Sequence, residues 1–183
     1  MSKIEIPLTA SVGRLVAPKP TVLVTCIDDR GKANIIAIAA VTIVSYEPPL
    51  YMIAIRDNRY SHDIISQTKE FVINIPSIDL VDEVHMCGSF SGNSVDKFKT
   101  TGLTPTQAKK VSAPLIDECP INIECKVVTS IKPGTHTLFI GEVLATHVEQ
   151  GLFDEGILDL EKFSVIIYNY REYRIPGDII KQI

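Results

Sequence analysis

Runs of β-branched residues in the first third of the chain predict three consecutive strands. Apolar residues dominate residues 21–27, 34–46 and 50–55, where Ile, Val and Thr favour strand over helix. Gly31 can close the first turn, and Pro48-Pro49 breaks the chain after the second run. Short connections of this kind are typical of an antiparallel meander, so we expect the three strands to pair in chain order.

Three short helical patterns follow. Residues 61–68 begin with Ser61, a residue type that caps helix N-termini by accepting a backbone N–H. Residues 78–86 place apolar side chains at helical spacing, and residues 93–100 carry Lys97 on a third short helix.

The rest of the chain returns mostly to strand patterns. The strand-like runs are residues 71–75, 121–130, 137–148 and 163–169. Lys132-Pro133-Gly134-Thr135 is typical of a hairpin connection, whereas prolines limit any helix in residues 101–120. Because strands dominate and do not alternate with long helices, the predicted fold is mainly β, an antiparallel barrel with a few short peripheral helices.

Length and charge narrow the class of protein. The chain has 183 residues, enough for one domain with a well-buried core, and a formal net charge of −4, which does not favour nucleic acid as a partner. Residues 1–7 lack the apolar centre of a signal peptide, and the apolar run 35–44 is shorter than the roughly 20 residues that span a membrane. We therefore expect a soluble cytoplasmic protein with no membrane partner.

Several site motifs are absent from the sequence. It contains no GxGxxG after a strand, no GxxxxGK[ST], no GxSxG and no HExxH, which disfavours dinucleotide-binding, P-loop, hydrolase and metalloenzyme classes. None of the four cysteines has CxxC spacing, so we predict no metal site and expect buried, reduced thiols. Cys87, which precedes Gly88, is expected in a loop.

Polar side chains near the predicted helix starts suggest an anion site. Ser61 and the backbone amides beside it could hold a phosphate, and Arg59 and His62 add donors around the same helix start. Ser89, Ser91 and Lys97 could form a second anion-binding concavity. Plain helix capping by Ser61, and a surface lysine at position 97, explain the same residues without a ligand.

Two further polar residues lie where strands begin. Asn34 could read the hydrogen-bonding edge of a flat heterocycle, because its amide both donates and accepts. His136 could donate to a phosphate or lie beside a reacting ring. An ordinary turn asparagine and a loop histidine are the alternatives.

In order and spacing, residues 20–148 resemble the flavin reductase-like family of FMN-binding split β-barrels, and within it the flavoredoxin branch. The segments that carry the resemblance are Gly31-Lys32-Ala33-Asn34, Thr42-Ile43-Val44-Ser45 with Pro48-Pro49, Tyr60-Ser61-His62, Glu70 to Pro76, Cys87-Gly88-Ser89 with Ser91-Gly92, Asp96-Lys97-Phe98, Gly134-Thr135-His136 and Ile140-Gly141-Glu142-Val143. The chain departs from flavoredoxin-like sequences in having Ala39-Ala40 where a tryptophan often stands, and it has no tryptophan.

The resemblance implies a split β-barrel of Greek-key type and a homodimer that binds FMN near the subunit interface. Residues 1–183 would form one FMN-binding domain, with its core at about 18–170. The flavin ring would face Asn34, Ala39, Ala40, Val41 and Thr42, with Tyr168 or Tyr170 packed on it. The ribityl phosphate would lie among Tyr60, Ser61, His62, Ser91 and Lys97. His136 would approach the cofactor and is the candidate for a proton-handling, catalytic role.

The activity implied by the resemblance is that of an NAD(P)H-dependent flavin reductase-like oxidoreductase. Electrons would pass from NADH or NADPH through FMN to a flavin, a ferric complex or a protein acceptor. A non-catalytic FMN carrier or flavin store would use the same binding residues and stays open. So do a split barrel that binds heme or a pyridoxal phosphate vitamer, and a purely structural domain.

Overall fold

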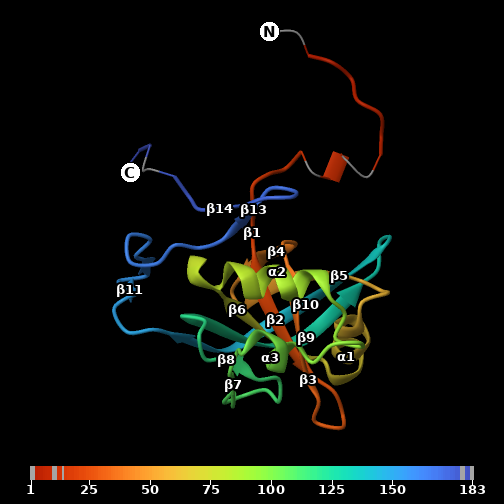
Figure 1. Ribbon diagram of the computed structural model, residues 1–183, viewed down its shortest axis with the longest axis vertical. Helices are drawn as coiled ribbons and strands as arrows, with labels where there is room; N and C mark the ends of the chain where they lie inside the picture. The colour runs from red at the N-terminus through yellow and green to blue at the C-terminus, as the bar shows by residue number, and fades with distance from the viewer. Residues whose placement is uncertain (1–2, 10–11, 14, 178–179, 182–183) are drawn as a thin grey trace.

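A seven-stranded antiparallel sheet, rolled on itself, forms the body of the molecule (Figure 1). The computed structural model describes residues 3–9, 12–13, 15–177 and 180–181. The strands of this sheet are β2 (Val22–Ile27), β3 (Ala33–Ile38), β4 (Val41–Tyr46), β5 (Pro49–Arg56), β6 (Glu70–Ile75), β9 (Ile121–Ile131) and β10 (His136–Val148). Their order is β3-β2-β6-β9-β10-β5-β4. The predicted mainly β, antiparallel fold is therefore confirmed.

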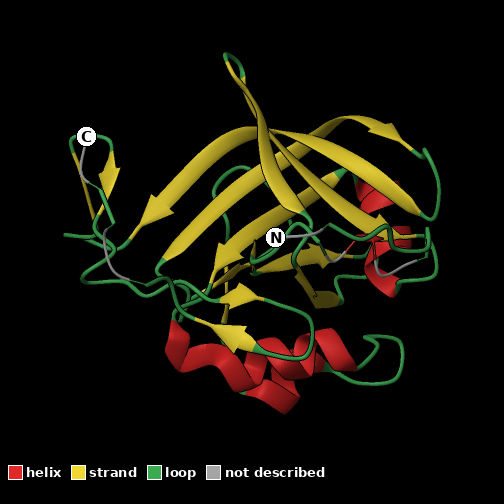
Figure 2. Ribbon diagram, turned by 90° about the horizontal axis from the view of Figure 1, so that it is seen from above, coloured by secondary structure: helices red, strands yellow, loops and turns green. Residues whose placement is uncertain are grey.

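Shorter elements surround the main sheet. The additional strands are β1 (Lys19–Pro20), β7 (Pro105–Thr106), β8 (Leu115–Ile116), β11 (Phe153–Asp154), β12 (Ile157–Leu158), β13 (Ile167–Tyr168) and β14 (Tyr173–Arg174). The helices are α1 (Tyr60–Thr68), α2 (Val81–Ser89) and α3 (Lys97–Thr101), with a 3₁₀ turn at Ile78–Leu80. Figure 2 shows that the helices lie outside the rolled sheet rather than within it. β1, β13 and β14 form a separate three-stranded sheet.

The link between β3 and β4 corrects two predictions. Residues 34–46 do not form one long strand, because the chain turns at Ala39-Ala40. β3 and β4 then lie at opposite edges of the sheet, so the expected three-stranded meander is not continuous, although its two pairings, β2 with β3 and β4 with β5, are confirmed. The amide of Ala54 on β5 donates to the Ala40 carbonyl at 2.9 Å, which ties the turn to the far edge. The small side chains of Ala39 and Ala40 permit this corner. Strand propensity does not predict the break, because the residues on both sides of it are apolar and favour strand.

Aromatic side chains fill the interior of the rolled sheet, where β6 and β10 approach each other closely. Phe71 on β6 and Phe139 on β10 are both buried in the main core. A Cβ atom at Gly141 would lie 2.6 Å from the Phe71 ring, so only glycine leaves room for that ring. β-bulges between Ile140 and Gly141, and between Val143 and Ala145, interrupt the register of β10 with β9. Bulges increase bending and twist, which suits a rolled sheet.

Helix boundaries differ from the prediction at both candidate anion sites. Arg59, not Ser61, is the N-cap of α1, and Ser61 is a buried residue of the first turn. The third helix is shorter than residues 93–100, because it begins at Lys97 after Asp96, whose carboxylate accepts the Lys99 amide at 3.3 Å. Aspartate at a cap competes for the backbone amides that would extend the helix toward its N-terminus.

The structure also refines the predictions for residues 163–169, expected as a strand, and for residues 101–120, expected to be irregular. Of residues 163–169, only Ile167–Tyr168 is strand, with a single bridge at Val165. The mostly irregular residues 101–120 are held to the sheet by the buried Glu124 carboxylate. It accepts the amides of residues 109, 110 and 111 at 2.9, 2.6 and 3.2 Å, and it pairs with His147 Nε2 at 2.6 Å. Those bonds account for the carboxylate in an otherwise apolar setting.

The cysteines are buried and unpaired, as predicted. Cys87, however, lies in α2 and not in a loop, and burial raises the pKa of its thiol to about 11. A thiol with that pKa is unreactive at neutral pH, because the thiolate is the nucleophilic form.

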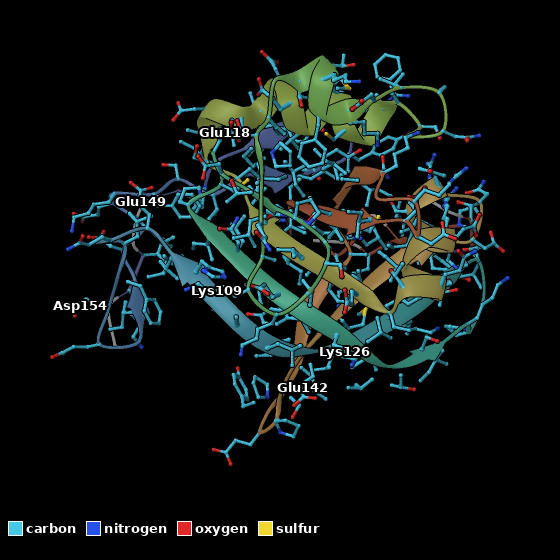
Figure 3. All side chains as sticks on the ribbon, turned by 90° about the horizontal axis from the view of Figure 1, so that it is seen from below. Lys109, Glu118, Lys126, Glu142, Glu149 and Asp154 are labelled. Atoms are coloured by element: carbon cyan, nitrogen blue, oxygen red, sulfur yellow. The ribbon has the colours of Figure 1, made fainter. Side chains whose placement is uncertain are left out.

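Charged side chains mark the face of the sheet opposite α2. Lys126 on β9 and Glu142 on β10 are cross-strand partners there, as Figure 3 shows. No helix in the described part of the chain has the length and hydropathy needed to cross a bilayer.

Candidate functional site

A groove runs along β3 and the first turn of α1, and it consists of three adjoining hollows. We call them the inner pocket (about 160 Å³), the central pocket (about 250 Å³) and the outer pocket (about 640 Å³). Ala37 and Arg59 line all three, so the hollows form one continuous depression. The larger two fall near or within the roughly 300–1,000 Å³ typical of small-molecule sites.

The inner pocket is built around a buried hydrogen bond between two distant segments. Asn34 Nδ2 on β3 donates to Ser61 Oγ on α1 at 2.7 Å. Both side chains are almost fully buried and line the pocket. Gly92 packs against them so closely that a Cβ atom there would lie 1.8 Å from Asn34 Oδ1. Because Ser61 Oγ accepts from Asn34, its own O–H is left to donate elsewhere.

Lys97 places a cation in the wall of the same pocket. Its side chain is only 4% exposed, and Nζ donates to the carbonyls of Ile35 at 2.7 Å and Cys87 at 2.6 Å. Desolvation lowers the pKa of Lys97, although the thiols of Cys87 and Cys26 oppose this. None of the ion pairs between described residues involves Lys97. A buried ammonium without a carboxylate partner is costly, and an anion in the pocket would offset that cost.

The N-terminus of α1 supplies further donors. Arg59 makes no side-chain capping bond to the helix, and helix geometry leaves the amides of Tyr60 and Ser61 without intrahelical acceptors. Tyr60 and Ser61 occupy that turn and line the inner pocket. The helix dipole favours negative charge at this end. Together with Lys97, this makes the inner pocket a site for a phosphate-sized anion.

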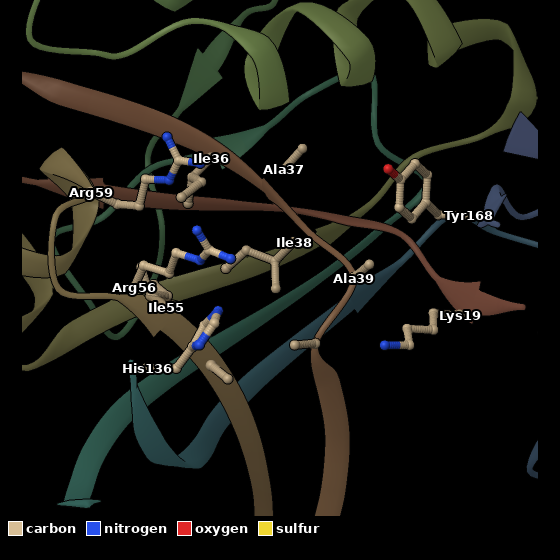
Figure 4. Close-up of a pocket in the computed structure, with 12 residues that line it drawn as sticks. Lys19, Ile36, Ala37, Ile38, Ala39, Ile55, Arg56, Arg59, His136 and Tyr168 are labelled. Carbon is tan, nitrogen blue, oxygen red and sulfur yellow. The ribbon is translucent and has the colours of Figure 1, made fainter. Parts of the chain in front are cut away.

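The central pocket combines an apolar floor with a cationic side. Ile36, Ile38 and Ala39 come from β3 and the turn after it. Figure 4 shows the side chains of Arg56, Arg59 and His136 on one side of the pocket and those of Tyr168 and Lys19 across from them. An apolar floor beside nitrogen donors suits a flat heteroaromatic ring.

His136 is held at this pocket by sheet register. It is the first residue of β10 and pairs with Arg56 on β5. Its Nδ1 lies 2.9 Å from the Thr135 hydroxyl. Burial and then the positive charge of Arg56 lower the pKa of His136, while Asp57 opposes the shift. The imidazole is therefore neutral at neutral pH and can both donate and accept a hydrogen bond.

The structure brings most of the sequence-predicted residues to the groove. Those that line it are Asn34, Ala39, Ala40, Arg59, Tyr60, Ser61, Ser89, Ser91, Lys97, His136 and Tyr168. Ser89 lines the outer pocket, so it does not share the inner pocket with Ser91 and Lys97. Lysine 97 is buried, which contradicts its alternative reading as a surface residue.

Three predicted residues lie outside the lining of these hollows. His62 turns away from the inner pocket, because its Nε2 lies 2.9 Å from Thr137 Oγ1 and its ring packs against Phe139. Val41 and Thr42 belong to β4, where they pair with β5, and Thr42 is exposed.

Sequence reasoning missed other lining residues. Arg56 ends β5 just after the buried Ile55, and its spacing of three residues from Arg59 was a usable signal. Gly92 was noted only as part of a motif, and its contact with Asn34 depends on long-range packing. Lys32 does not line the hollows, but it was also missed as a residue that supports the inner pocket: its Nζ donates to the Gly92 carbonyl at 3.3 Å and lies 5.3 Å from the centre of the Tyr60 ring.

Among the described residues, no group of three or more His, Cys, Asp or Glu side chains is placed to hold a metal ion. The groove offers nitrogen and hydroxyl donors instead, which match an anionic organic ligand better than a cation.

Comparison with known proteins defines the class. Residues 13–175 match the family described as "Flavin reductase like domain", and the chain belongs to that family. It is similar to flavoredoxin of Desulfovibrio vulgaris (Miyazaki F), at 32% identity over 98% of this chain and 97% of the other, with a TM-score of 0.87. Flavoredoxin from Methanosarcina acetivorans is 26% identical over 100% and 95% of the two chains, with a TM-score of 0.88.

An uncharacterized protein of Archaeoglobus fulgidus is 39% identical over 130 residues, which are 70% of this chain and 72% of that protein. The fold is thus that of the flavin reductase-like split barrels, as the resemblance implied. Family membership supports a flavin-related oxidoreductase role for the chain.

Proposed function

We propose that the chain binds FMN in the groove and is an NAD(P)H-dependent oxidoreductase that delivers electrons to a flavin, a ferric complex or a protein. The observation that carries this proposal is the inner pocket, where a buried Lys97 ammonium faces no carboxylate. FMN would supply the site with a group that accepts an electron pair and releases it in one or two steps.

The residues of the groove fit the parts of FMN. The phosphate would be held by Lys97 Nζ, the Ser61 hydroxyl and the first-turn amides of α1. Arg59 lines the inner, central and outer pockets, and so links the anionic end to the ring end. Ile36, Ile38 and Tyr168 would pack against the flat ring.

His136 is the titratable side chain best placed to hold a proton beside the ring. Its lowered pKa keeps it neutral at neutral pH, so one ring nitrogen can donate while the other accepts. Because Nδ1 already contacts the Thr135 hydroxyl, Nε2 is the atom left for the groove. This role would orient a substrate or exchange a proton with it.

A homodimer with FMN near its interface is part of the proposal. Apolar residues remain exposed on β4, β9 and β10: Val44, Tyr46, Val128, Ile131, Leu144 and Val148. Such a surface is typical of an interface. β4 begins directly after Ala40, which lines the central pocket, so a partner covering β4 would lie beside the ring. Light scattering should give twice the chain mass, and a stable monomer would refute the dimer.

The test of function begins with the visible spectrum of the purified chain. We expect one FMN per chain on titration, with a flavin absorption band. Anaerobic addition of NADH or NADPH should then bleach that band, and oxygen, free flavin or a ferric complex should restore it. If FMN binds but neither nucleotide bleaches it, the chain is an FMN carrier or store and the reductase is rejected. A protein that binds no flavin would overturn the whole proposal.

A further inference from the structure

The outer pocket carries an excess of positive charge. The charge comes from Arg56, Arg59 and Arg171, which all line it. No Asp or Glu is among its described lining residues, although the whole chain has a net charge of −4. The local charge therefore runs against the composition of the chain, and it exceeds what one cofactor phosphate in the inner pocket would balance.

The carboxylates nearest in sequence are engaged elsewhere. Glu172 accepts from Arg174 Nε at 2.8 Å and from Asn169 Nδ2 at 2.7 Å. Asp57, next to Arg56, accepts from Lys132 Nζ at 2.7 Å. The ion pairs between described residues include none of the three groove arginines. Their guanidinium groups thus keep their forked donors for a ligand.

Aromatic side chains, which we call the tyrosine wall, also line the outer pocket. Tyr168, Tyr170 and Tyr173 all line it. The rings of Tyr168 and Tyr173 lie 5.6 Å apart, and the ring of His85 meets Tyr173 edge-on at 6.0 Å. Three phenol rings beside a row of cations provide both stacking surface and charge for one ligand.

The β13–β14 hairpin fixes the position of Arg171. The Asn169 amide donates to the Glu172 carbonyl at 3.0 Å across the turn. Tyr170 and Arg171 have φ values of 22° and 77°, a left-handed backbone that bulky residues rarely adopt. The Arg171 guanidinium lies 5.4 Å from the centre of the Tyr170 ring. Strain of this kind persists where the surrounding structure holds it, and it is common at ligand sites.

From these observations we propose that the outer pocket is the subsite for the second substrate, and that this substrate is a planar ring bearing an anionic group. Arg171 binds the anionic group together with Arg56, and the tyrosine wall stacks on the ring. Arg171 is then a specificity residue. The inference rests on the proposed function, because the central pocket must hold FMN for a ligand in the outer pocket to reach it.

Two ligand sources share this chemistry, an aromatic acid as electron acceptor and a nicotinamide nucleotide as donor. Calorimetry on the FMN-loaded chain would use two pairs of probes, benzoate with benzamide and nicotinamide mononucleotide with nicotinamide riboside. In at least one pair the anionic member should bind about tenfold more tightly, the effect of one charge-assisted hydrogen bond. Arg171→Gln should remove that preference, and added salt should weaken only the anionic member.

A matched control is Arg30→Gln, because Arg30 is exposed in a turn away from the groove. Arg30→Gln should leave the affinities of both probe pairs unchanged. If it removes the preference for the anionic probe as fully as Arg171→Gln does, the preference comes from the overall charge of the chain, and the inference is overturned. FMN titration of the same samples separates the two proposals. If FMN binds normally in Arg171→Gln but neither pair shows a charge preference in the unsubstituted chain, only the inference fails. If the unsubstituted chain binds no FMN, both fail. The pair that responds identifies acceptor or donor.

Discussion

Asn34 and Ser61 join β3 to the first turn of α1 through a buried hydrogen bond of 2.7 Å. Because Asn34 donates, the Ser61 hydroxyl must use its proton on a different acceptor. The inner pocket is the space it lines, and Lys97 lines it too. Residues far apart in the chain therefore present donors to one small cavity, and this arrangement can be tested residue by residue.

Ser61→Ala should weaken FMN binding by about 1–3 kcal/mol, because it removes a hydrogen bond to a charged oxygen. Riboflavin lacks the phosphate, so its affinity should change much less. Fluorescence titration with both flavins measures the difference. Ser130→Ala, on an exposed part of β9, is the control and should leave both affinities unchanged. If Ser61→Ala weakens FMN and riboflavin binding equally, the phosphate does not contact Ser61.

Gly92→Ala should disrupt the same pocket by crowding. The added Cβ would lie 1.8 Å from Asn34 Oδ1, so Asn34 must move and its bond to Ser61 must lengthen or break. We expect a loss of FMN affinity of about 1–3 kcal/mol, similar to losing a buried hydrogen-bond partner. Gly177→Ala is the matched control, because its Cβ would meet nothing within 4 Å. Unchanged FMN affinity in Gly92→Ala would contradict the assigned role of Asn34.

Local sequence signals predicted most strands and helices, and they drew attention to Asn34, Ser61 and Lys97. They failed where distant contacts decide. The corner at Ala39-Ala40 depends on the bond from Ala54, and no local property marks it. Serine is a common N-cap residue, but Ser61 lies inside the first turn of α1, where its side chain bonds to Asn34.

The burial of Lys97 was likewise beyond a local prediction. A lysine on a short polar helix is exposed by default, and its burial follows from carbonyl acceptors on β3 and α2 that lie 62 and 10 residues away in sequence. Arg171 was missed because its place in the groove depends on the strained turn between β13 and β14, which no local pattern predicts.

The lowered pKa of Lys97 leads us to expect that alkaline pH raises the stability of the flavin-free chain and lowers its affinity for FMN. Burial lowers its pKa below 10.5 in the folded chain, whereas the unfolded chain keeps the usual value. Between the two values the unfolded state binds more protons, so the free energy of unfolding contributed by this group rises with pH. Over the same range the ammonium is lost in the folded state, so FMN affinity should fall.

The measurement compares FMN with riboflavin from pH 8 upward, together with urea unfolding of the flavin-free chain. The ratio of the two affinities isolates the phosphate, because both ligands carry the same ring. In Lys97→Met the alkaline fall in that ratio should disappear, and FMN should bind more weakly by about 1.5–3 kcal/mol at neutral pH. If the ratio of FMN to riboflavin affinity does not change with pH in the unsubstituted chain, the Lys97 ammonium does not bind the phosphate.

His136 gives a prediction on the acid side. Its pKa is lowered first by burial and then by the positive charge of Arg56, its cross-strand partner. An NMR titration should therefore give His136 a midpoint below 6.5, and Arg56→Gln should move that midpoint upward because it removes a like charge. Lys126→Gln removes a charge much farther along the sheet, where Lys126 pairs with Glu142 of β10, and should leave the midpoint unchanged.

The same shift fixes the sign of a stability effect. Below pH 6.5 the unfolded chain takes up a proton at this histidine before the folded chain does, so the free energy of unfolding contributed by His136 falls as the pH falls. His136→Asn should reduce that acid loss, measured by urea unfolding between pH 5 and 8. If the midpoint of His136 lies above 6.5, or does not respond to Arg56→Gln, the imidazole is not a neutral group beside Arg56. Its assignment as the proton-holding residue of the groove would then be withdrawn.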